Sequence, residues 1–385
     1  MKPLLPGATL GVMGGGQLAR MFVHAAQRMG YFTAVLDPDA GSPAGRVSHT
    51  HVQADYLDEA GLAALWGHSA AITTEFENVP AQALARLAEH RTVAPSAAAV
   101  AIAQDRAQEK AHFTRCGVPC APHAVIAQAD DIEAAADDLL PGILKTARLG
   151  YDGKGQVRVR NREELRLGWE SLGRATCVLE KLLPLAFECS VVVARGSDGA
   201  MVHLPVQRNL HREGILAVTE VFDGCVPAGQ AAQAIEATRA IAAGIGYVGV
   251  LCVEFFGLAD GSLVVNEMAP RPHNSGHWSL DAADLSQFEL QVRTLAGLPL
   301  VQPRQHSPAI MLNLLGDLWF PPAGPQREPD WAGVLALPGA HLHLYGKLSA
   351  RAGRKMGHLT FTGDQVDAVR ATALQAADLL GIPAF

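Results

Sequence analysis

Residues 251–278 read LCVEFFGLADGSLVVNEMAPRPHNSGHW, and this stretch says the most about the architecture. Two apolar runs flank Asp260-Gly261, a dipeptide that favours a two-residue hairpin turn. The resulting register puts Glu254 directly across from Glu267. Like charges in that position destabilise a sheet, so we interpret the pair as a divalent-cation site. Mg²⁺ fits because it takes oxygen ligands and shares them with phosphates.

The two acids of this hairpin have an alternative explanation, in which both face solvent on an edge hairpin and bind no metal. In an ideal strand Asn266 points to the opposite face, so any role for Asn266 in the same site requires a local distortion. Replacement of Glu267 by Gln is expected to relieve the like-charge repulsion in the metal-free chain.

The segment that follows the second strand is rich in groups that bind anions. Arg271, His273, Asn274, Ser275 and His277 crowd into seven positions. A guanidinium and two imidazoles beside a metal site suit anion capture and proton transfer. A solvated polar loop is the plainer alternative.

Upstream, Lys145 ends an apolar run, and a glycine-rich loop at 150–156 follows it. Three glycines in six positions allow a lid whose amides wrap phosphate oxygens. The loop lacks the spacing of a P-loop, and an ordinary hairpin loop remains possible. Beyond it, Glu180-Lys181-Leu182-Leu183 and Glu188 flank a strand boundary and could be solvated strand ends.

A second glycine loop, Gly14-x-Gly16-x-x-Ala19, follows a strand and opens a helix, with Asp37 after the next strand. This is the spacing of a dinucleotide fingerprint. The glycines and the helix N-terminus favour anion binding without specifying the anion. A nicotinamide or flavin cofactor, another phosphate and a structural turn all stay open at this point.

Alternating strand and helix patterns fill the first hundred residues and predict a parallel α/β sheet. After about residue 117 the pattern changes to α+β, with a helix expected over 130–140. A basic group of Lys347, Arg351, Arg354 and Lys355 lies between two C-terminal strands, where a phosphate clamp and a solvated loop are both plausible.

Composition excludes several classes of protein. Hydrophobic residues make up 49% of the 385 residues and charged residues 18%, which excludes global disorder. The net charge of −7 argues against a nucleic-acid binder. The six cysteines form no CxxC pair and no cluster with histidine, so neither a zinc site nor a disulfide framework is expected. No stretch suggests a membrane span or a signal peptide, and we expect a cytoplasmic protein.

Taken together, the motifs resemble the ATP-grasp superfamily and, within it, the N5-carboxyaminoimidazole ribonucleotide synthetases of purine biosynthesis. The resemblance covers nearly the whole chain. It rests on GGGQLARM at 14–21, TTEFENVP at 73–80, GYDGKGQ at 150–156, NLHREGIL at 209–216, NEMAPRPHNSGHW at 266–278 and GRKMGHL at 353–359.

The resemblance implies three parts. These are an N-terminal parallel α/β (pre-ATP-grasp) domain at 1–104, an ATP-grasp domain at 105–298 with a mobile small lobe at about 120–185, and a small α+β C-terminal domain at 299–385 that completes the substrate site. It also implies carboxylation of 5-aminoimidazole ribonucleotide by ATP and bicarbonate through carboxyphosphate. Mg²⁺ is implied, whereas NAD, flavin and zinc are not. Partner molecules are then small substrates, with no nucleic acid or membrane, and a homodimer is expected.

Site residues carry over from the family position by position. The implied ATP site comprises Arg106, Lys145, Gly150, Tyr151, Asp152, Gly153, Lys154, Gly155, Gln156, Glu180, Lys181, Leu182, Leu183, Glu188, His211, Asn266 and Glu267. Glu254 and Glu267 would hold the metal, and Arg271, His273 and Asn274 would handle bicarbonate. The ribonucleotide would contact Gln17, Glu75, Tyr151, Lys347, Arg354 and Lys355.

Three alternatives remain at this stage. Another ATP-grasp ligase, such as a formate-dependent glycinamide ribonucleotide transformylase or a biotin carboxylase, would use the same ATP site. A dehydrogenase would use the loop at 14–19. A catalytically inactive ATP-binding protein of the same fold is the third, and the intact acids and Arg271 argue against it.

Overall fold

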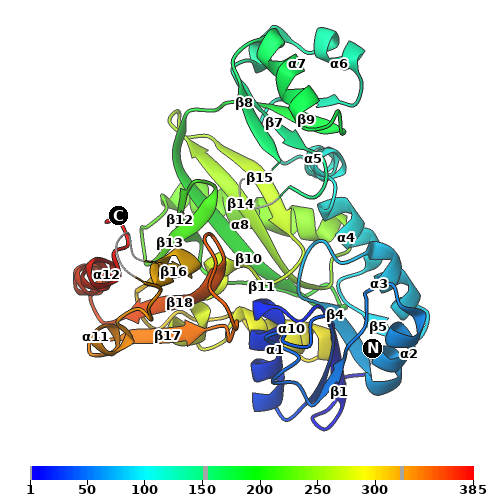
Figure 1. The fold of residues 1–385 in the computed structure, drawn as a ribbon, viewed down its shortest axis with the longest axis vertical. Coiled ribbons are helices and arrows are strands. Elements are labelled where there is room, and N and C mark those ends of the chain that lie inside the picture. Colours follow the sequence, from blue (N-terminus) through cyan, green and yellow to red (C-terminus); the bar gives the residue numbers. More distant parts are fainter. Residues whose placement is uncertain (1, 151–154, 321–324) are drawn as a thin grey trace.

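The computed structural model describes residues 2–150, 155–320 and 325–385, and these contain three sheets (Figure 1). The first sheet is parallel, with strand order β3-β2-β1-β4-β5. Its strands are β1 (Thr9–Met13), β2 (Phe32–Leu36), β3 (Thr50–Val52), β4 (Ala71–Thr74) and β5 (Thr92–Val93). This confirms the predicted parallel α/β arrangement.

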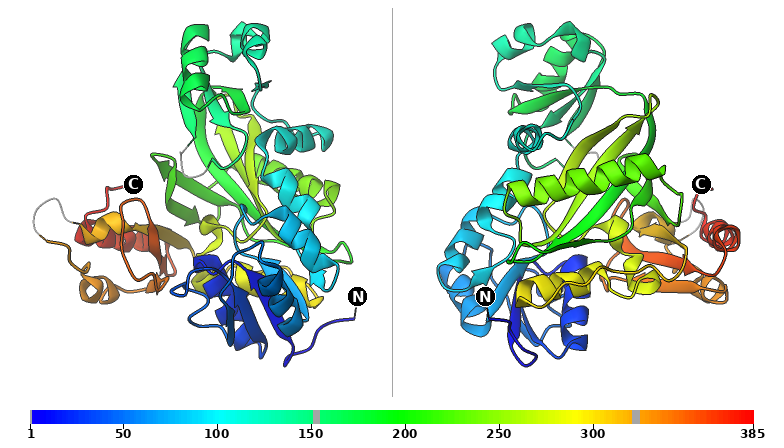
Figure 2. Two further views of the ribbon diagram at one scale, coloured as in Figure 1. Left: turned by 45° about the vertical axis from the view of Figure 1, so that its right-hand side comes forward. Right: turned by 180° about the vertical axis from the view of Figure 1, so that it is seen from behind.

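Helices cover both faces of this sheet because its strands carry apolar side chains on both faces. Leu10 and Val12 pack with α1 (Gln17–Arg28) and with α10 (Gln287–Ala296) from much later in the chain. Met13 and Ile72 pack on the other side with α2 (Glu59–His68) and α3 (Ala81–Ala88). The N-terminal sheet is thus fixed to the centre of the molecule by α10 (Figure 2).

The second sheet forms the small lobe at the top of Figure 1 and is antiparallel. Its order is β6-β9-β7-β8, formed by β6 (His123–Ile126), β9 (Cys177–Lys181), β7 (Gly142–Thr146) and β8 (Gln156–Val159). Two helices, α6 (Ala129–Ala134) and α7 (Arg162–Ser171), contribute Ile132, Leu165 and Trp169 to a core with strand residues Leu144 and Leu179.

The third and largest sheet has nine strands, all paired antiparallel, and runs through the middle of the molecule. Its main path is β15-β14-β10-β12-β13-β16-β18-β17, and β11 also pairs with β10. The bounds are β10 (Leu185–Arg195), β11 (Met201–His203), β12 (Gln207–Arg212), β13 (Ile215–Val221), β14 (Gly249–Leu258), β15 (Leu263–Ala269), β16 (Ala309–Leu315), β17 (Ala340–Leu344) and β18 (Lys355–Thr362).

One long helix and one C-terminal helix cover this sheet. Helix α8 (Ala228–Gly244) packs Ile241 against Val253 and Phe255 of β14. Helix α12 (Val366–Leu380) packs Val369 against Phe361 of β18. The remaining helices are α4 (Ala97–Ala103), α5 (Arg106–Arg115), α9 (Ser279–Ala282) and α11 (Trp331–Leu335), with short 3-10 turns η1 (Asp137–Leu139), η2 (Asn274–Gly276) and η3 (Gly316–Trp319).

Strands from the predicted C-terminal part continue this same sheet. Residues 309–315 pair with β13 of the central part, so the sheet crosses the predicted boundary at 298/299 without a break. The three-part division remains a prediction about domains. The structure adds that the central strands and the C-terminal hairpin β17–β18 belong to one hydrogen-bonded sheet.

Two local expectations were wrong. The helix expected over 130–140 is broken: α6 ends at Ala134, extended backbone follows, and η1 begins at Asp137. The turn of the β14–β15 hairpin has three residues, 259–261, because Leu258 pairs with Ser262. Gly261 has a φ of +85° there, the left-handed conformation that closes a three-residue loop.

Among the described residues, no helix has the length and apolar character needed to cross a membrane. All six cysteines are free thiols.

Candidate active site

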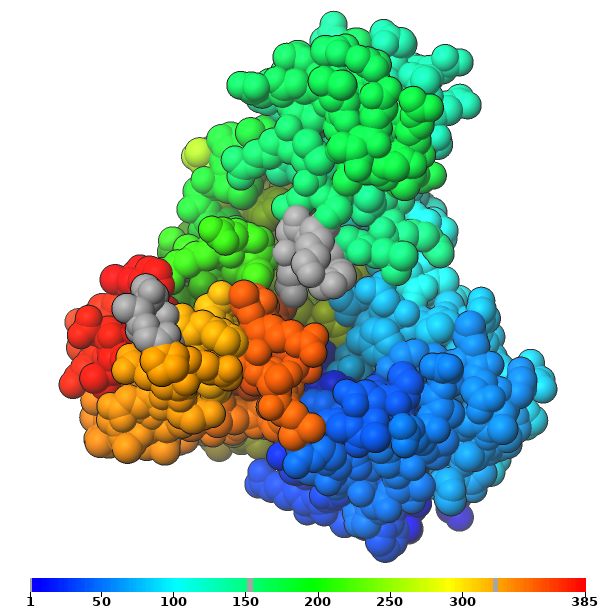
Figure 3. Space-filling view, in the orientation of Figure 1, coloured from blue at the N-terminus to red at the C-terminus, as the bar shows by residue number. Residues whose placement is uncertain are grey.

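A cavity of about 610 Å³ lies between the small lobe and the large sheet. Figure 3 shows the surface hollowed where the small lobe, the C-terminal hairpin and the N-terminal part meet. Twelve predicted site residues line it: Arg106, Lys145, Gly150, Gln156, Glu188, His211, Glu254, Asn266, Glu267, Arg271, His273 and Lys355. A second hollow of about 670 Å³, lined by residues between 114 and 139, contains no predicted site residue.

The two hairpin acids lie opposite each other as predicted, although the strand register around them differs from the predicted one. The three-residue turn shifts the register by one position near the turn, so Phe255 pairs with Val265. Asn266 then forms a β-bulge, and the register shifts back, so Glu254 pairs with Glu267. The bulge also supplies the distortion that Asn266 needs, since Asn266 lines the cavity together with both acids.

The surroundings of these two carboxyl groups shift their pKa values in opposite directions. Burial raises the pKa of Glu254 to about 7, and the facing Glu267 charge adds to this while His211 opposes it. For Glu267, burial acts in the same direction, but the Arg106 guanidinium, 2.8 Å away, outweighs it and lowers the pKa to about 2. At neutral pH the two carboxyl groups together therefore carry less than two negative charges, which weakens the repulsion between them.

These acids meet the requirements of a hard cation. Buried side-chain oxygens of Glu254 and Asn266 have no hydrogen-bond partner among the described residues. Together with Glu267 they offer only oxygen donors facing one cavity, which is the ligand type Mg²⁺ prefers. A cation here would also offset the repulsion between the carboxylates.

A buried ion-pair network lies behind the cavity wall at Lys145. Glu180 of β9 is 4% exposed and lies 3.0 Å from Lys145 Nζ and 3.1 Å from Lys110 Nζ. Burial acts against ionisation, but the two ammonium groups outweigh it and lower the pKa of Glu180. Lys145 is thereby held at the cavity wall. Lys110, from α5, is the partner that sequence reasoning missed.

Two further positive groups of the cavity, Arg271 and His211, are each matched by an acid. Arg271 donates through Nε to Glu77 and through Nη1 to the carbonyl of Pro272 at 3.0 Å. Although burial opposes it, Glu77 raises the pKa of Arg271 above its ordinary value. His211 pairs with Glu188, and this contact outweighs burial and raises the pKa of His211.

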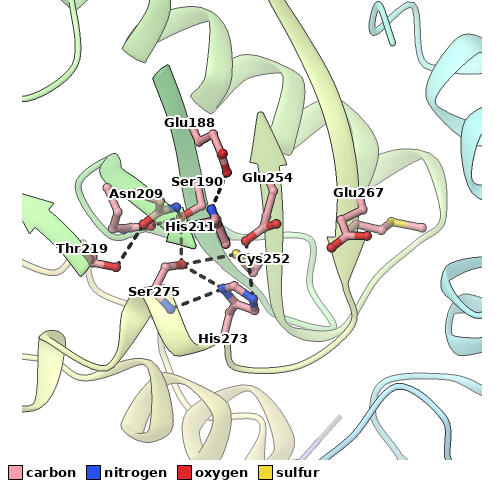
Figure 4. Close-up of polar contacts among 12 residues, drawn as sticks. Glu188, Ser190, Asn209, His211, Thr219, Cys252, Glu254, Glu267, His273 and Ser275 are labelled. Atoms are coloured by element: carbon pink, nitrogen blue, oxygen red, sulfur yellow. Dashed lines mark hydrogen bonds and ion pairs between the residues drawn. The ribbon is translucent and has the colours of Figure 1, made fainter. Parts of the chain in front are cut away.

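His273 is held from two sides (Figure 4). Its Nδ1 lies 2.9 Å from Ser275 Oγ, and its Nε2 lies 3.5 Å from Glu254 Oε1. Ser275 in turn accepts from the Ser190 hydroxyl at 2.8 Å. Burial and the nearby Arg271 charge hold the pKa of His273 well below its ordinary value, so the ring is neutral.

Gln287 of α10 clamps the same segment. Its Oε1 accepts from the His273 backbone N–H at 2.9 Å, and its Nε2 donates to the His273 carbonyl at 2.8 Å and to His277 Nδ1 at 2.9 Å. Gly276 permits this contact, because a Cβ at that position would lie 2.6 Å from Gln287 Oε1. The loop 273–277 is thus positioned by a fully buried amide.

The first glycine loop binds carboxylates of its own chain. Gly16 N donates to Glu75 Oε1 at 3.0 Å, and Ala19 N is 3.4 Å from Glu75 Oε2. Gly15 N donates to Asp37 Oδ2 at 2.7 Å. The amides that a dinucleotide pyrophosphate would need are therefore occupied, and this argues against the dehydrogenase alternative.

Several predicted site residues lie outside the lining of the cavity. Asn274 is 6% exposed, and neither amide atom of its side chain has a hydrogen-bond partner among the described residues. Lys347 donates to the Lys355 carbonyl at 2.5 Å, and Arg354 donates to the Ser349 carbonyl at 2.8 Å. The others outside the lining are Gln17, Glu75, Gly155, Glu180, Lys181, Leu182 and Leu183. Tyr151, Asp152, Gly153 and Lys154 lie outside the described residues.

Three acids and amides in the site were not predicted. Glu77 had a sequence signal, since it stands two residues after Glu75 in the quoted motif at 73–80. Glu109 accepts the Met268 N–H at 2.7 Å, and burial raises the pKa of Glu109 to about 8. Neither Glu109 nor Gln287 carries a local pattern that separates it from an ordinary helix residue.

Family models match three successive parts of the chain. Residues 7–104 match the ribonucleotide synthetase preATP-grasp domain, residues 111–288 the ATP-grasp domain, and residues 309–372 the phosphoribosylaminoimidazole carboxylase C-terminal domain.

Similar proteins cover almost the whole chain. An N5-carboxyaminoimidazole ribonucleotide synthase from Brucella melitensis is 43% identical over 364 residues, which is 93% of this chain and 97% of that protein. One from Bacillus subtilis is 38% identical over 363 residues, covering 93% and 92%.

Solved structures agree with these relatives. An N5-carboxyaminoimidazole ribonucleotide synthetase in complex with ADP superimposes with a TM-score of 0.91 at 36% identity, covering 99% of both chains. A synthase from Aspergillus clavatus, solved with ADP and 5-aminoimidazole ribonucleotide, gives a TM-score of 0.88 at 28% identity and covers 98% of this chain and all of that one.

Proposed function

Because the chain belongs to the family of N5-carboxyaminoimidazole ribonucleotide synthases, an ATP-grasp family of purine biosynthesis, we propose that the 610 Å³ cavity is where it carboxylates 5-aminoimidazole ribonucleotide. ATP drives the conversion in this family. The finer assignments are bicarbonate as the carboxyl source, carboxyphosphate as the intermediate and Mg²⁺ as the metal.

The observation that carries the proposal is the Glu254–Glu267 pair at the floor of the cavity, facing Lys145 and Arg106. Glu254, Glu267 and Asn266 would hold Mg²⁺, which when bound neutralises charge on the transferring phosphoryl group. Lys145 and Arg106 would contact the ATP phosphates.

The adenosine part of ATP is assigned to the segment that joins the small lobe to the large sheet. Backbone groups of residues 180–183 would line adenine, and Glu188 would accept from the ribose hydroxyls, with His211 beside it. Gly150, Gly155 and Gln156 border residues 151–154, and this whole loop is proposed to cover the phosphates.

Arg271, His273 and Asn274 are proposed to handle bicarbonate. A bicarbonate oxygen attacks the γ-phosphorus, the bond to the ADP oxygen breaks, and carboxyphosphate forms. Arg271 would stabilise the charge on both anions. The ribonucleotide amine then attacks the carboxyl carbon, and phosphate leaves and takes the proton lost from nitrogen.

The ribonucleotide itself is assigned to Gln17, Glu75, Tyr151, Lys347, Arg354 and Lys355. Support comes from Lys355, which lines the cavity, and from the contact between Lys347 and the Lys355 carbonyl. We also propose a homodimer and the three-part domain division at 104/105 and 298/299.

The test is ADP release measured with each candidate acceptor, with and without bicarbonate. The proposal expects turnover only when 5-aminoimidazole ribonucleotide and bicarbonate are both present. Equal ADP release with glycinamide ribonucleotide and formate would favour the transformylase alternative, and release with biotin and bicarbonate would favour a biotin carboxylase.

A further inference from the structure

A second group of ligand-type side chains lies where hairpin β17–β18 packs against α9, and none of its members lines the cavity. His343 Nε2 is 3.1 and 2.9 Å from the two carboxylate oxygens of Asp281. His341 Nδ1 is 3.8 Å from the same carboxylate. His358 pairs with His343 across the strands, and the two rings stack with centroids 4.5 Å apart.

His358 has an unused donor atom. The residue is fully buried, and its Nε2 has no hydrogen-bond partner among the described residues. A buried imidazole nitrogen without a partner is an uncommon arrangement, and it leaves this atom available to an ion.

Hydroxyl groups fix the outer nitrogens of two of these rings. Tyr345 Oη lies 3.0 Å from His358 Nδ1, and Thr362 Oγ1 lies 2.9 Å from His341 Nε2. In metal sites, a hydrogen bond to the outer nitrogen orients the ring and sets which nitrogen is left for the ion. The same two contacts leave His358 Nε2 and His341 Nδ1 for an ion, and His341 Nδ1 faces the Asp281 carboxylate.

We propose that Asp281, His343 and His358 bind a transition-metal ion of the Zn²⁺ type, with His341 as the fourth ligand. The ligand atoms of Asp281, His343 and His358 lie within 4.8 Å of one another, against about 3.3 Å between the ligands of a tetrahedral zinc ion. Binding requires the stacked His343 ring to rotate, which its 31% exposure allows. The ion then takes the place of the proton that His343 shares with Asp281.

The donor set separates this site from the pair of glutamates in the cavity. Imidazole nitrogens suit Zn²⁺ and its neighbours, whereas Mg²⁺ prefers oxygen. No zinc site was expected from the sequence, because the cysteines form no CxxC pair and no cluster with histidine. The present ligands come instead from alternate positions on one strand, from its neighbour, and from a helix some sixty positions earlier.

A bound ion would tie two parts of the molecule together. Asp281 belongs to α9, while His343 and His358 belong to the hairpin whose connecting loop carries Lys347 and Arg354. The ion therefore adds a cross-link between the central part and the C-terminal hairpin, and the full chain should unfold at a higher temperature when the ion is bound.

The experiment uses the full chain, treated with EDTA, dialysed and kept in excess Mg²⁺ so that the oxygen site is saturated. Co²⁺ serves as the spectroscopic probe, and Zn²⁺ is then measured by calorimetry. We expect one ion per chain, the visible absorption of tetrahedral Co²⁺, loss of that absorption on adding Zn²⁺, and a raised melting temperature. No substrate is present, so the outcome does not depend on the proposed function.

Variants locate the ion. Asp281→Asn and His343→Gln should each weaken Zn²⁺ binding by more than about 100-fold, and Tyr345→Phe by roughly 10- to 100-fold. His68→Gln, at an exposed position on α2, is the matched control and should bind like the parent. Circular dichroism confirms that each variant is folded. Absence of Zn²⁺ binding to the parent, or equal binding by Asp281→Asn and His343→Gln, would overturn the proposal.

Discussion

Glu254 and Glu267 face each other on β14 and β15, yet the protein holds their carboxyl groups in different states. Burial raises the pKa of Glu254 to about 7, while Arg106 outweighs burial at Glu267 and lowers its pKa to about 2. A divalent cation between them would favour ionisation of both. The pair therefore couples metal binding to protonation.

Glu254→Gln should change how the stability of the metal-free protein depends on pH. The folded pKa of Glu254 exceeds its unfolded value, so this group's contribution is fully present at low pH and is lost as pH rises from about 4.5 through 7. Gln imitates the protonated form. The variant should match the parent near pH 5 and exceed its free energy of unfolding by about 1–3 kcal/mol at pH 8.

Denaturant unfolding in EDTA at a series of pH values measures this difference. Addition of Mg²⁺ should stabilise the parent and not Glu254→Gln. A difference that stays constant from pH 5 to pH 8 would show that Glu254 is ionised throughout.

Glu267→Gln should abolish turnover and also destabilise the metal-free protein. The sequence alone suggests relief of a like-charge pair, but the structure places Arg106 2.8 Å from Glu267. Loss of one partner of a fully buried pair costs roughly 3–5 kcal/mol. Because the Glu267 side chain is 40% exposed, we expect about 1–2 kcal/mol. Thermal melting of EDTA-treated Glu267→Gln and Glu254→Gln, each compared with the parent, measures the two effects. The prediction is contradicted if both variants shift the melting temperature in the same direction.

Arg271→Lys should lower kcat/KM by roughly 10³-fold with little change in the KM for ATP. Lysine keeps the charge but loses the planar fork that reaches Glu77 and the Pro272 carbonyl together. Steady-state kinetics with bicarbonate as the varied substrate measures the effect. Near-normal turnover of the lysine variant would mean that a point charge at this position is sufficient.

Arg354→Ala should mainly raise the KM for the ribonucleotide, because a grip on a phosphate that does not react is shared by ground and transition states. Arg351→Ala, in the same loop, is the matched control. Kinetics with each substrate varied in turn separates the possibilities. Weakened ATP binding with an unchanged ribonucleotide KM would move Arg354 to the nucleotide.

Sequence reasoning located the acids correctly while mistaking the turn. It assumed a two-residue loop, and the structure has a three-residue loop plus a bulge at Asn266. The two deviations cancel at Glu254 and Glu267, since each shifts the register by one residue in opposite directions. Local turn propensity could not reveal this, because a bulge depends on packing between neighbouring strands.

Contacts between residues far apart in the chain could not be predicted from the sequence. Lys110 pairs with Glu180 from 70 positions away, and Gln287 clamps His273 from another helix. Nothing in the helix pattern of either residue distinguishes it from a solvent-facing neighbour. The occupation of the first glycine loop by Glu75 was equally hidden, since it depends on how β4 ends beside β1.

Transfer of ¹⁸O from bicarbonate to phosphate tests the central claim most directly. The claim is that a bicarbonate oxygen forms a bond to the γ-phosphorus before the carboxyl group reaches the ribonucleotide. With fully ¹⁸O-labelled bicarbonate, ATP and 5-aminoimidazole ribonucleotide, mass spectrometry should find one ¹⁸O atom in each phosphate released. Phosphate released without ¹⁸O would contradict the account, because ATP would then have been cleaved by another nucleophile.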